Sequence, residues 1–367
     1  MNRLSTGETG RAISLKDVRK RWGDTVSLDG INLDIPAGKF TAILGPSGCG
    51  KSTTLRIIAG LETVSDGSVR IGGEDVTHLP PDKRRLSMVF QNYALFPHLS
   101  VAENIVFGLR VERLSKSDRD ARLREVADLL ELTPYLARKP AALSGGQQQR
   151  VALGRAVVSC RPVCLMDEPL SNLDARLRDE MRREIRALQR SLGFTMVYVT
   201  HDQTEAITMA DQVVLMNAGR IEQVASPQEI YKSPATPFAA RFIGTPPMNL
   251  LPAAAFASTP ADVPDDVLVG LRPERLSLSE TGNLHCVVTS SEFLGADTLV
   301  ALNASGHPML AKLPGNLSFS VGQTVRLSAA LDDIHLFQNS TDTRLGAPDL
   351  AVHFAAQSLG QPSETTQ

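Results

Sequence analysis

The sequence predicts an α/β domain followed by a smaller all-β domain, and three observations support this fold class. The 367 residues exceed the usual length of one domain. Continuous apolar runs at 39–44, 163–167 and 196–200 each lead into a polar loop and a helical pattern, as buried parallel strands do. Beyond a proline-interrupted segment near residues 234–247, short β-like runs follow, which indicate a separate all-β domain.

The strands expected at the start of the chain are of a different kind. Residues 12–18, 31–35 and 68–73 alternate apolar with polar side chains and end in Gly or Pro turns. This period of two predicts half-buried antiparallel strands. Together with the buried parallel strands, they predict a mixed sheet.

Helical patterns fill the middle of the first domain. Ser100 and Glu103 have the spacing of a capping box, and apolar residues recur at helical intervals between 123 and 130. A second helix is expected over 174–192, with Gly193 as its C-terminal stop. Its many arginines alternate with acidic residues, which indicates a solvated face.

These patterns divide the chain into parts. We predict a first domain over residues 12–240, with a helical subdomain at about 91–159. A small all-β domain is expected over 241–340. The polar, breaker-rich residues 341–367 predict a mobile tail.

Charge and composition exclude several function classes. Lys and Arg number 38 against 40 Asp and Glu, so a net charge of −2 provides no overall field for nucleic acid or anionic lipid. The N-terminal residues lack the apolar core of a signal peptide, and no run approaches the roughly 20 apolar residues of a membrane span. We therefore expect a cytosolic protein that contacts membranes only through a partner. The four cysteines lack metal-site spacing and are expected to be reduced thiols.

The strongest local motif is GPSGCGKST, which fits the phosphate-binding pattern G-x-x-x-x-G-K-[ST] between an expected strand and an expected helix. Glycines let the backbone wrap closely, so that N–H groups and the helix N-terminus face the phosphates. Lys51 adds charge at the β- and γ-phosphates, and Ser52 offers a hydroxyl to Mg²⁺. The residues expected to contact the nucleotide here are Gly45, Pro46, Ser47, Gly48, Cys49, Gly50, Lys51, Ser52 and Thr53.

A pair of acidic residues follows one of the apolar strands. Asp167 ends the run 163–167, where it can hold Mg²⁺ through water, and Glu168 comes directly after it. Glu168 is the candidate general base, because the end of the strand can turn its carboxylate toward an attacking water. The alternative is a buried acidic pair with a structural role.

A second anion site is indicated by the segment LSGGQ. Ser144, Gly145, Gly146 and Gln147 stand immediately before a helical run, and a helix N-terminus favours negative charge. One nucleotide already has one phosphate cradle, so this segment is expected to contact the nucleotide of another subunit. An ordinary helix cap is the alternative.

The N-terminal two-thirds of the chain resembles the ABC transporter ATPase family. The resemblance is carried, in this order, by GPSGCGKST, Gln91, LSGGQ, VCLMDE, the Ser171–Asp174 loop and His201. The resemblance implies ATP and Mg²⁺ as ligands, with Gln91 linking the metal site to a permease, Asp174 at a dimer seam and His201 orienting the γ-phosphate. Trp22 is similar to the aromatic residue that stacks on adenine in this family, although a sole Trp could equally be a core residue. Gln148 departs from the basic residue common in relatives.

The C-terminal third resembles the accessory OB-like, TOBE-type β domain of carbohydrate-import ATPases, particularly those for glycerol 3-phosphate. The similar segments are 242–251, 271–274, 292–300 and 334–337. The resemblance implies a homodimer at the cytoplasmic face of the inner membrane, two integral-membrane permease subunits, an extracytoplasmic solute-binding protein and no nucleic acid. It leaves open whether the β domain senses a regulator or only stabilises a dimer.

The resulting function hypothesis is the ATP-hydrolysing subunit of an ABC importer, a translocase-class ATPase. Its first candidate solute is sn-glycerol 3-phosphate, and maltose- or trehalose-type sugars are the alternative. A soluble ABC ATPase without a permease is a third possibility, but such proteins usually carry long coiled coils or two cassettes in one chain, and this sequence has one cassette and no long heptad run. A regulatory binding module in the β domain is compatible with transport.

Overall fold

The computed structural model describes residues 10–256, 264, 266–346 and 354. The chain divides into two compact units, Met1–Gln228 and Glu229–Gln367, and each is described by itself. The sequence analysis predicts the boundary between the domains after residue 240, and the two units of the structure divide after Gln228. Of the expected tail at 341–367, the structure describes 341–346 and Phe354, and its Thr343–Arg344 pair with a neighbouring strand. The rest of the tail lies outside the described residues.

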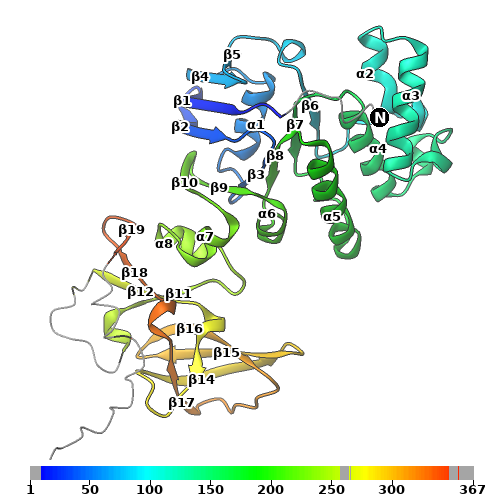
Figure 1. Cartoon of the computed structure of the whole chain (residues 1–367). Coiled ribbons are helices and arrows are strands. Elements are labelled where there is room, and N and C mark those ends of the chain that lie inside the picture. The colour runs from blue at the N-terminus through cyan, green and yellow to red at the C-terminus, as the bar shows by residue number, and fades with distance from the viewer. Residues whose placement is uncertain (1–9, 257–263, 265, 347–353, 355–367) are drawn as a thin grey trace, which may run out of the picture. The chain divides into compact units, whose positions relative to one another are not determined.

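A six-stranded sheet forms the centre of the first unit (Figure 1). Its strand order is β10-β9-β3-β8-β7-β6, and every pairing is parallel except that of β10 with β9. The predicted buried parallel strands are confirmed as β3, β7 and β8. The bounds are β3 Phe40–Leu44, β6 Leu86–Val89, β7 Val163–Asp167, β8 Thr195–Thr200, β9 Gln212–Asn217 and β10 Arg220–Ala225.

The alternating segments near the N-terminus form a sheet of their own. Its order is β2-β1-β4-β5 and all its pairings are antiparallel, as the alternation predicts. It stands beside the parallel strands as a second sheet, and the antiparallel member of the mixed sheet is instead the edge strand β10. The bounds are β1 Ile13–Trp22, β2 Thr25–Ile35, β4 Asp66–Ile71 and β5 Glu74–Asp75.

Two helices of the first unit, α2 and α5, have the end residues that the sequence marks. Ser100 and Glu103 form the predicted capping box. Asp174 caps the long helix α5, and Gly193 ends it with a left-handed φ of 69°. The bounds are α1 Lys51–Ala59, α2 Val101–Val111, α3 Lys116–Leu129, α4 Gly145–Val157, α5 Ala175–Leu192 and α6 Gln203–Met209, with short 3₁₀ turns at Pro81–Lys83, Thr133–Tyr135 and Pro140–Ala142.

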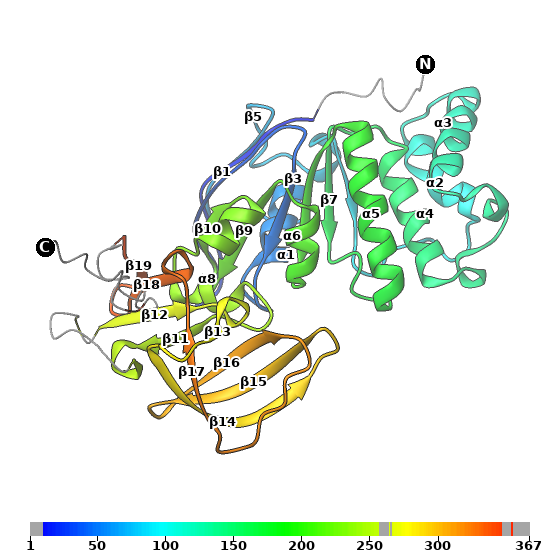
Figure 2. The ribbon, with the colours of Figure 1, turned by 60° about the horizontal axis from the view of Figure 1, so that its bottom comes forward.

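Two apolar cores lie on opposite faces of the six-stranded sheet. On β7, Val163 and Leu165 pack with α1 and the antiparallel sheet, whereas Cys164 and Met166 pack with α4 and α5. Figure 2 shows α1 and α5 on the two sides of β7. Because successive side chains of a strand point to opposite faces, a strand covered on both faces is a nearly continuous apolar run.

The second unit is built mainly of two antiparallel sheets (Figure 2). Their orders are β11-β12-β18-β19 and β13-β17-β14-β15-β16. Strand β16 was not predicted, because prolines stand near both of its ends and a lysine interrupts it. The bounds are α7 Pro227–Lys232, which spans the boundary of the units, α8 Pro237–Phe242, β11 Asn249–Pro252, β12 Val267–Leu271, β13 Ser277–Leu278, β14 Leu284–Phe293, β15 Asp297–Ala304, β16 His307–Pro314, β17 Thr324–Ser328, β18 Ile334–Gln338 and β19 Thr343–Arg344, with 3₁₀ turns at Ala253–Ala255, Pro273–Arg275 and Leu331–Asp333.

None of the helices in the described ranges combines the length and apolar character needed to cross a membrane.

Candidate functional site

The loop between β3 and α1 has the backbone that its glycines allow. Gly48 and Gly50 have left-handed φ values of 81° and 102°, and Gly50 is the residue that caps α1. At Gly45 a Cβ atom would lie 2.3 Å from the carbonyl oxygen of Met216 and 2.7 Å from Cys49 Sγ. The loop is therefore held in a close wrap that side chains at these positions would prevent. Burial raises the pKa of the Cys49 thiol, so this residue lines the loop as a neutral group.

Lys51, the first residue of α1, folds back onto this loop. Its ammonium donates hydrogen bonds to the carbonyl oxygens of Gly45 at 2.8 Å and Pro46 at 2.9 Å. The residue is only 5% exposed, and a buried cation is costly unless it is paired with an anion or fully hydrogen-bonded. A positive charge and a helix N-terminus thus meet at the same loop, which is the arrangement that binds phosphate.

Ser52 and Asp167 meet across 115 residues of sequence. The Ser52 hydroxyl donates to Asp167 Oδ1 at 2.7 Å, and Asp167 is the buried last residue of β7. Hydroxyl and carboxylate oxygens are the ligands that Mg²⁺ prefers, and the ion is commonly held by one or two carboxylates plus the phosphates of its substrate. The described residues contain no group of three or more His, Cys, Asp or Glu side chains placed to hold a metal by themselves. This pair therefore fits a nucleotide-bound Mg²⁺ better than a metal held by protein ligands alone.

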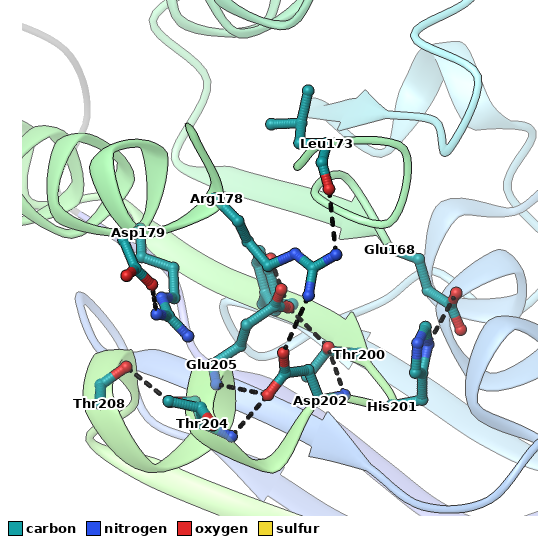
Figure 3. A network of polar contacts seen from close by, with 12 residues as sticks. Glu168, Leu173, Arg178, Asp179, Thr200, His201, Asp202, Thr204, Glu205 and Thr208 are labelled. Atoms are coloured by element: carbon teal, nitrogen blue, oxygen red, sulfur yellow. Dashed lines mark hydrogen bonds and ion pairs between the residues drawn. The ribbon is translucent and has the colours of Figure 1, made fainter. Parts of the chain in front are cut away.

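Glu168 leaves the strand geometry at the end of β7. Its φ is 45°, which is uncommon for a residue other than glycine, and its N–H donates to the carbonyl of Val199 at 3.0 Å. The carboxylate oxygen Oε2 lies 3.1 Å from Nδ1 of His201, which follows β8 (Figure 3). Residues in sparsely populated backbone regions cluster at functional sites, where the surrounding structure holds them. Two of the three predicted catalytic residues, Glu168 and His201, are thus in direct contact, and the third is Lys51.

Gln91 contacts the Ser171–Asp174 loop. Its side-chain amide donates to Ser171 Oγ at 3.4 Å, and its backbone carbonyl oxygen accepts from Asn172 Nδ2 at 3.1 Å. Among the described residues, no hydrogen bond joins Gln91 to Ser52 or Asp167. The structure therefore brings Gln91 to the loop that the sequence predicts at a dimer seam.

The LSGGQ segment begins helix α4 with a complete capping box. Ser144 Oγ accepts from the Gln147 N–H at 3.4 Å, and the Gln147 side chain accepts from the Ser144 N–H at 3.0 Å. At Gly146 a Cβ atom would lie 2.7 Å from a methyl carbon of Leu177, so the helix start fits closely on α5. In the described part of the chain, no hydrogen bond joins this segment to the expected phosphate-binding loop at 45–53. The helix cap is present, and Ser144 is exposed to solvent.

Two more predicted residues lie at the edges of elements. Asp174 Oδ1 accepts from the Leu177 N–H at 2.9 Å, so this carboxylate caps α5 and is also exposed. Trp22 ends β1 and is 49% exposed, which excludes the alternative that it is a core residue. The Lys20 ammonium lies 5.4 Å from the centre of its ring and is itself bonded to Glu62 and Thr63.

A polar network behind His201 was not among the predicted site residues. Glu205 is 4% exposed and accepts from Tyr198 Oη at 2.9 Å and from Thr200 Oγ1 at 2.6 Å (Figure 3). Burial raises the pKa of Glu205. The signal that could have identified it is an acidic residue on the buried face of the short helix after His201, where an apolar residue is expected.

Comparisons with known proteins agree with this geometry. Residues 28–171 match the family model described as ABC transporter, and residues 269–337 match that of the TOBE domain. The sn-glycerol-3-phosphate import ATP-binding protein UgpC of Ruegeria sp. (strain TM1040) is 47% identical over 347 residues, which cover 91% of this chain and 99% of the relative. The chain belongs to the ABC transporter family. It is an ATP-binding member with the ATPase cassette and a C-terminal TOBE domain, so the predicted fold class is confirmed.

Other similar proteins extend the comparison. The alpha-glucoside transport ATP-binding protein AglK of Rhizobium meliloti (strain 1021) is 47% identical over 351 residues, covering 89% of this chain and 97% of AglK. A dimeric structure of the ATP-binding cassette MJ0796 in a post-hydrolysis state, bound to ADP and Pi, superposes with a TM-score of 0.53 at 33% identity. It covers 59% of this chain and 98% of that one. A second dimeric structure of MJ0796, described as a bacterial ABC transporter cassette, has a TM-score of 0.54 and the same identity and coverage.

Proposed function

We propose that this ABC family member is the ATP-hydrolysing subunit of an importer, and that the residues described above bind and hydrolyse MgATP. The observation that carries the proposal is the pair of adjacent contacts at the end of β7. Asp167 accepts a hydrogen bond from Ser52 of the phosphate-binding motif, and the next residue, Glu168, contacts His201. The end of β7 thereby presents one carboxylate suited to bind a metal ion and a second suited to take a proton from water.

Each side chain has a distinct role in this proposal. Lys51 and the N–H groups at the start of α1 would bind the β- and γ-phosphates. Ser52 and Asp167 would hold Mg²⁺, and Gln91 would complete that site from its loop. Bound Mg²⁺ would neutralise charge on the phosphate oxygens. Glu168 accepts the proton of the attacking water as the water oxygen bonds to the γ-phosphorus and the bond to the ADP oxygen breaks. His201 orients the γ-phosphate, and its contact with Glu168 Oε2 fixes the carboxylate of the base.

The nucleotide site is proposed to be shared between two copies of the chain. Each chain has two helix starts suited to anions, at Lys51 and at Ser144, but only one phosphate-type loop. ATP would close two chains head to tail, with the Ser144–Gln147 segment and Asp174 of one facing the nucleotide of the other. Hydrolysis reopens them, and the cycle drives two integral-membrane permease subunits at the cytoplasmic face of the inner membrane. An extracytoplasmic solute-binding protein acts through the permease, and no nucleic acid takes part.

The proposed solute is sn-glycerol 3-phosphate, because relatives over nearly the whole chain are import proteins for it. AglK, a transport protein for alpha-glucosides at the same level of identity, favours a sugar as the second candidate. The test is to purify the chain with its permease, reconstitute the complex in liposomes with its solute-binding protein, and measure ATP-driven uptake. We expect uptake of labelled sn-glycerol 3-phosphate that maltose and trehalose do not inhibit. Uptake of the sugars alone would select the second candidate, and ATP hydrolysis with no associated permease would contradict import.

Trp22 is expected to report adenine binding, because it is the sole Trp of the chain and is exposed. Stacking of a base on an aromatic ring contributes about 1–3 kcal/mol, so Trp22→Ala should weaken ATP binding on the order of 10- to 100-fold. Trp22→Phe keeps a ring and should retain most of the affinity. Trp emission titrated with ATP measures the first effect in the wild-type protein, and equilibrium dialysis measures affinity in both variants. Unchanged affinity in Trp22→Ala would show that adenine stacks elsewhere.

A further inference from the structure

Arg178 lies between two loops that flank the Glu168–His201 pair. From the N-terminal part of α5, its Nη2 donates to the carbonyl oxygen of Leu173 at 3.1 Å. Its Nη1 lies 3.5 Å from Asp202 Oδ2, directly after His201 in the chain. Figure 3 shows the guanidinium between Leu173 and Asp202, with Glu168 and His201 beside them. One side chain thus contacts both the Ser171–Asp174 loop and the segment that carries His201.

The segment around His201 is also held by hydrogen bonds of its neighbours Thr200 and Asp202. The Asp202 N–H donates to Thr200 Oγ1 at 3.0 Å, and the Thr200 hydroxyl donates to Glu205 Oε2 at 2.6 Å. Asp202 Oδ1 also accepts from the Thr204 N–H at 2.7 Å, at the start of α6. Asp202 is thus bonded to both Thr200 and Thr204, and it follows His201 directly in the chain.

The Ser171–Asp174 loop is in turn bonded to Glu168. The carbonyl oxygen of Glu168 accepts from Ser171 Oγ at 2.9 Å and from the Ser171 N–H at 3.3 Å. The contacts therefore form a closed ring, which runs from Glu168 through the loop to Arg178, through Asp202 to His201, and back to Glu168. Arg178 joins the Ser171–Asp174 loop to the His201 segment on one side of this ring, and the Glu168–His201 contact closes it on the other.

We propose that Arg178 is a positioning residue for ATP hydrolysis, which holds the Glu168–His201 pair in register with the Ser171–Asp174 loop. This inference rests on the proposed function, in which that loop lies at the seam between two chains. Closure of the dimer would displace the loop, and Arg178 would transmit that displacement through Asp202 to His201. The hydrolytic pair, which is already in contact within one chain, would then take its final position at the nucleotide when the second chain is in place.

The chemistry of the site favours this role over simple stabilisation of α5. A cation near a helix N-terminus is unfavourable to the helix dipole, so Arg178 does not serve the helix that carries it. Its ion pair with Asp202 is partly exposed to solvent, and such pairs contribute little to stability. A planar guanidinium can donate in two directions at once, to a carbonyl and to a carboxylate, whereas lysine presents a single point charge.

The test is a double-mutant cycle on the full chain. Arg178→Met removes both contacts, and Asp202→Asn removes the charge while keeping an oxygen that can cap α6. Each single variant is expected to lower kcat on the order of tenfold, with the Kd for ATP and the melting temperature unchanged. The double variant should be no slower than the slower single variant, because one shared contact is lost in all three. Arg183→Met, an exposed change on the same helix, is the control and should match the wild type.

Several results would overturn the proposal. Wild-type kcat in either single variant, or a double variant whose loss equals the product of the two, would show that Arg178 and Asp202 do not act together. A lower melting temperature with weaker ATP binding would assign Arg178 to folding alone. If Arg178→Met does not fold, Arg178→Lys and Asp202→Asn make the same comparison. Absence of ATP hydrolysis by the wild-type dimer would instead contradict the proposed function.

Discussion

Replacing Glu168 with Gln is expected to slow ATP hydrolysis by about 10²- to 10⁴-fold, the usual contribution of general-base catalysis, while ATP binding stays intact. The amide has nearly the same shape as the carboxylate, and its oxygen can still accept a hydrogen bond from His201, now 3.1 Å from Glu168 Oε2. It cannot take a proton from water. Closed dimers with bound ATP should therefore accumulate, which size-exclusion chromatography in the presence of MgATP measures.

A matched control separates loss of the base from a general effect of charge removal. Glu280 is an exposed carboxylate of the second unit, and Glu280→Gln should hydrolyse ATP at the wild-type rate. Phosphate release gives the rates, and Trp emission gives nucleotide binding in the same samples. Turnover by Glu168→Gln within a few-fold of the wild type would move the role of general base to another group. Loss of ATP binding would show instead that Glu168 holds the nucleotide or the loop.

Much of the first unit could be predicted from the sequence, because strands buried on both faces and strands buried on one face have different patterns of apolar residues. The strands at 40–44, 163–167 and 195–200 are buried at every position and are therefore mostly apolar, with polar residues chiefly at their ends. The alternating N-terminal strands have one covered face and are antiparallel, as expected. Alternation alone does not say which strands share a sheet, so the separate antiparallel sheet was not predicted.

The site could be predicted only as far as local motifs define it. Lys51 and Ser52 belong to one motif, and Asp167 could be placed beside them because both stand at the carboxyl ends of buried parallel strands. The contact of Glu168 with His201 depends on the left-handed backbone of Glu168, which no pattern of side chains indicates. Arg178 was missed for a similar reason, since the arginines of α5 alternate with acidic residues, as on a solvated face. Its two contacts appear only once the loops before and after α5 are placed.

The second large effect concerns which chain supplies which part of the nucleotide site. Lys51→Ala removes the cation that lies against the phosphate-type loop, and Ser144→Arg places a large cation at the start of α4. In a homodimer either change alters both sites and should abolish trapping of ATP. The two substitutions therefore reveal which chain supplies each part of the nucleotide site only in heterodimers, where the two chains carry different substitutions.

Two heterodimers with different tags distinguish the arrangements. The split pair combines a Lys51→Ala chain with a Ser144→Arg chain, and the other pair has both changes in one chain beside an unchanged partner. If each site joins the loop of one chain to the Ser144–Gly146 segment of the other, the split pair keeps one intact site and the other pair keeps none. If each site lies within one chain, the result is reversed. Both pairs carry the same substitutions, so a cost to folding does not bias the comparison.

The measurement is the number of ATP molecules occluded per dimer after rapid gel filtration, with Glu168→Gln in all chains to block hydrolysis. The unmodified Glu168→Gln dimer provides the reference value for two intact sites. A site shared between head-to-tail chains predicts one occluded nucleotide in the split pair and none in the doubly changed pair. Occlusion by the doubly changed pair and not by the split pair would contradict the shared site, and with it the proposed roles of Ser144–Gly146 and of the loop at Asp174.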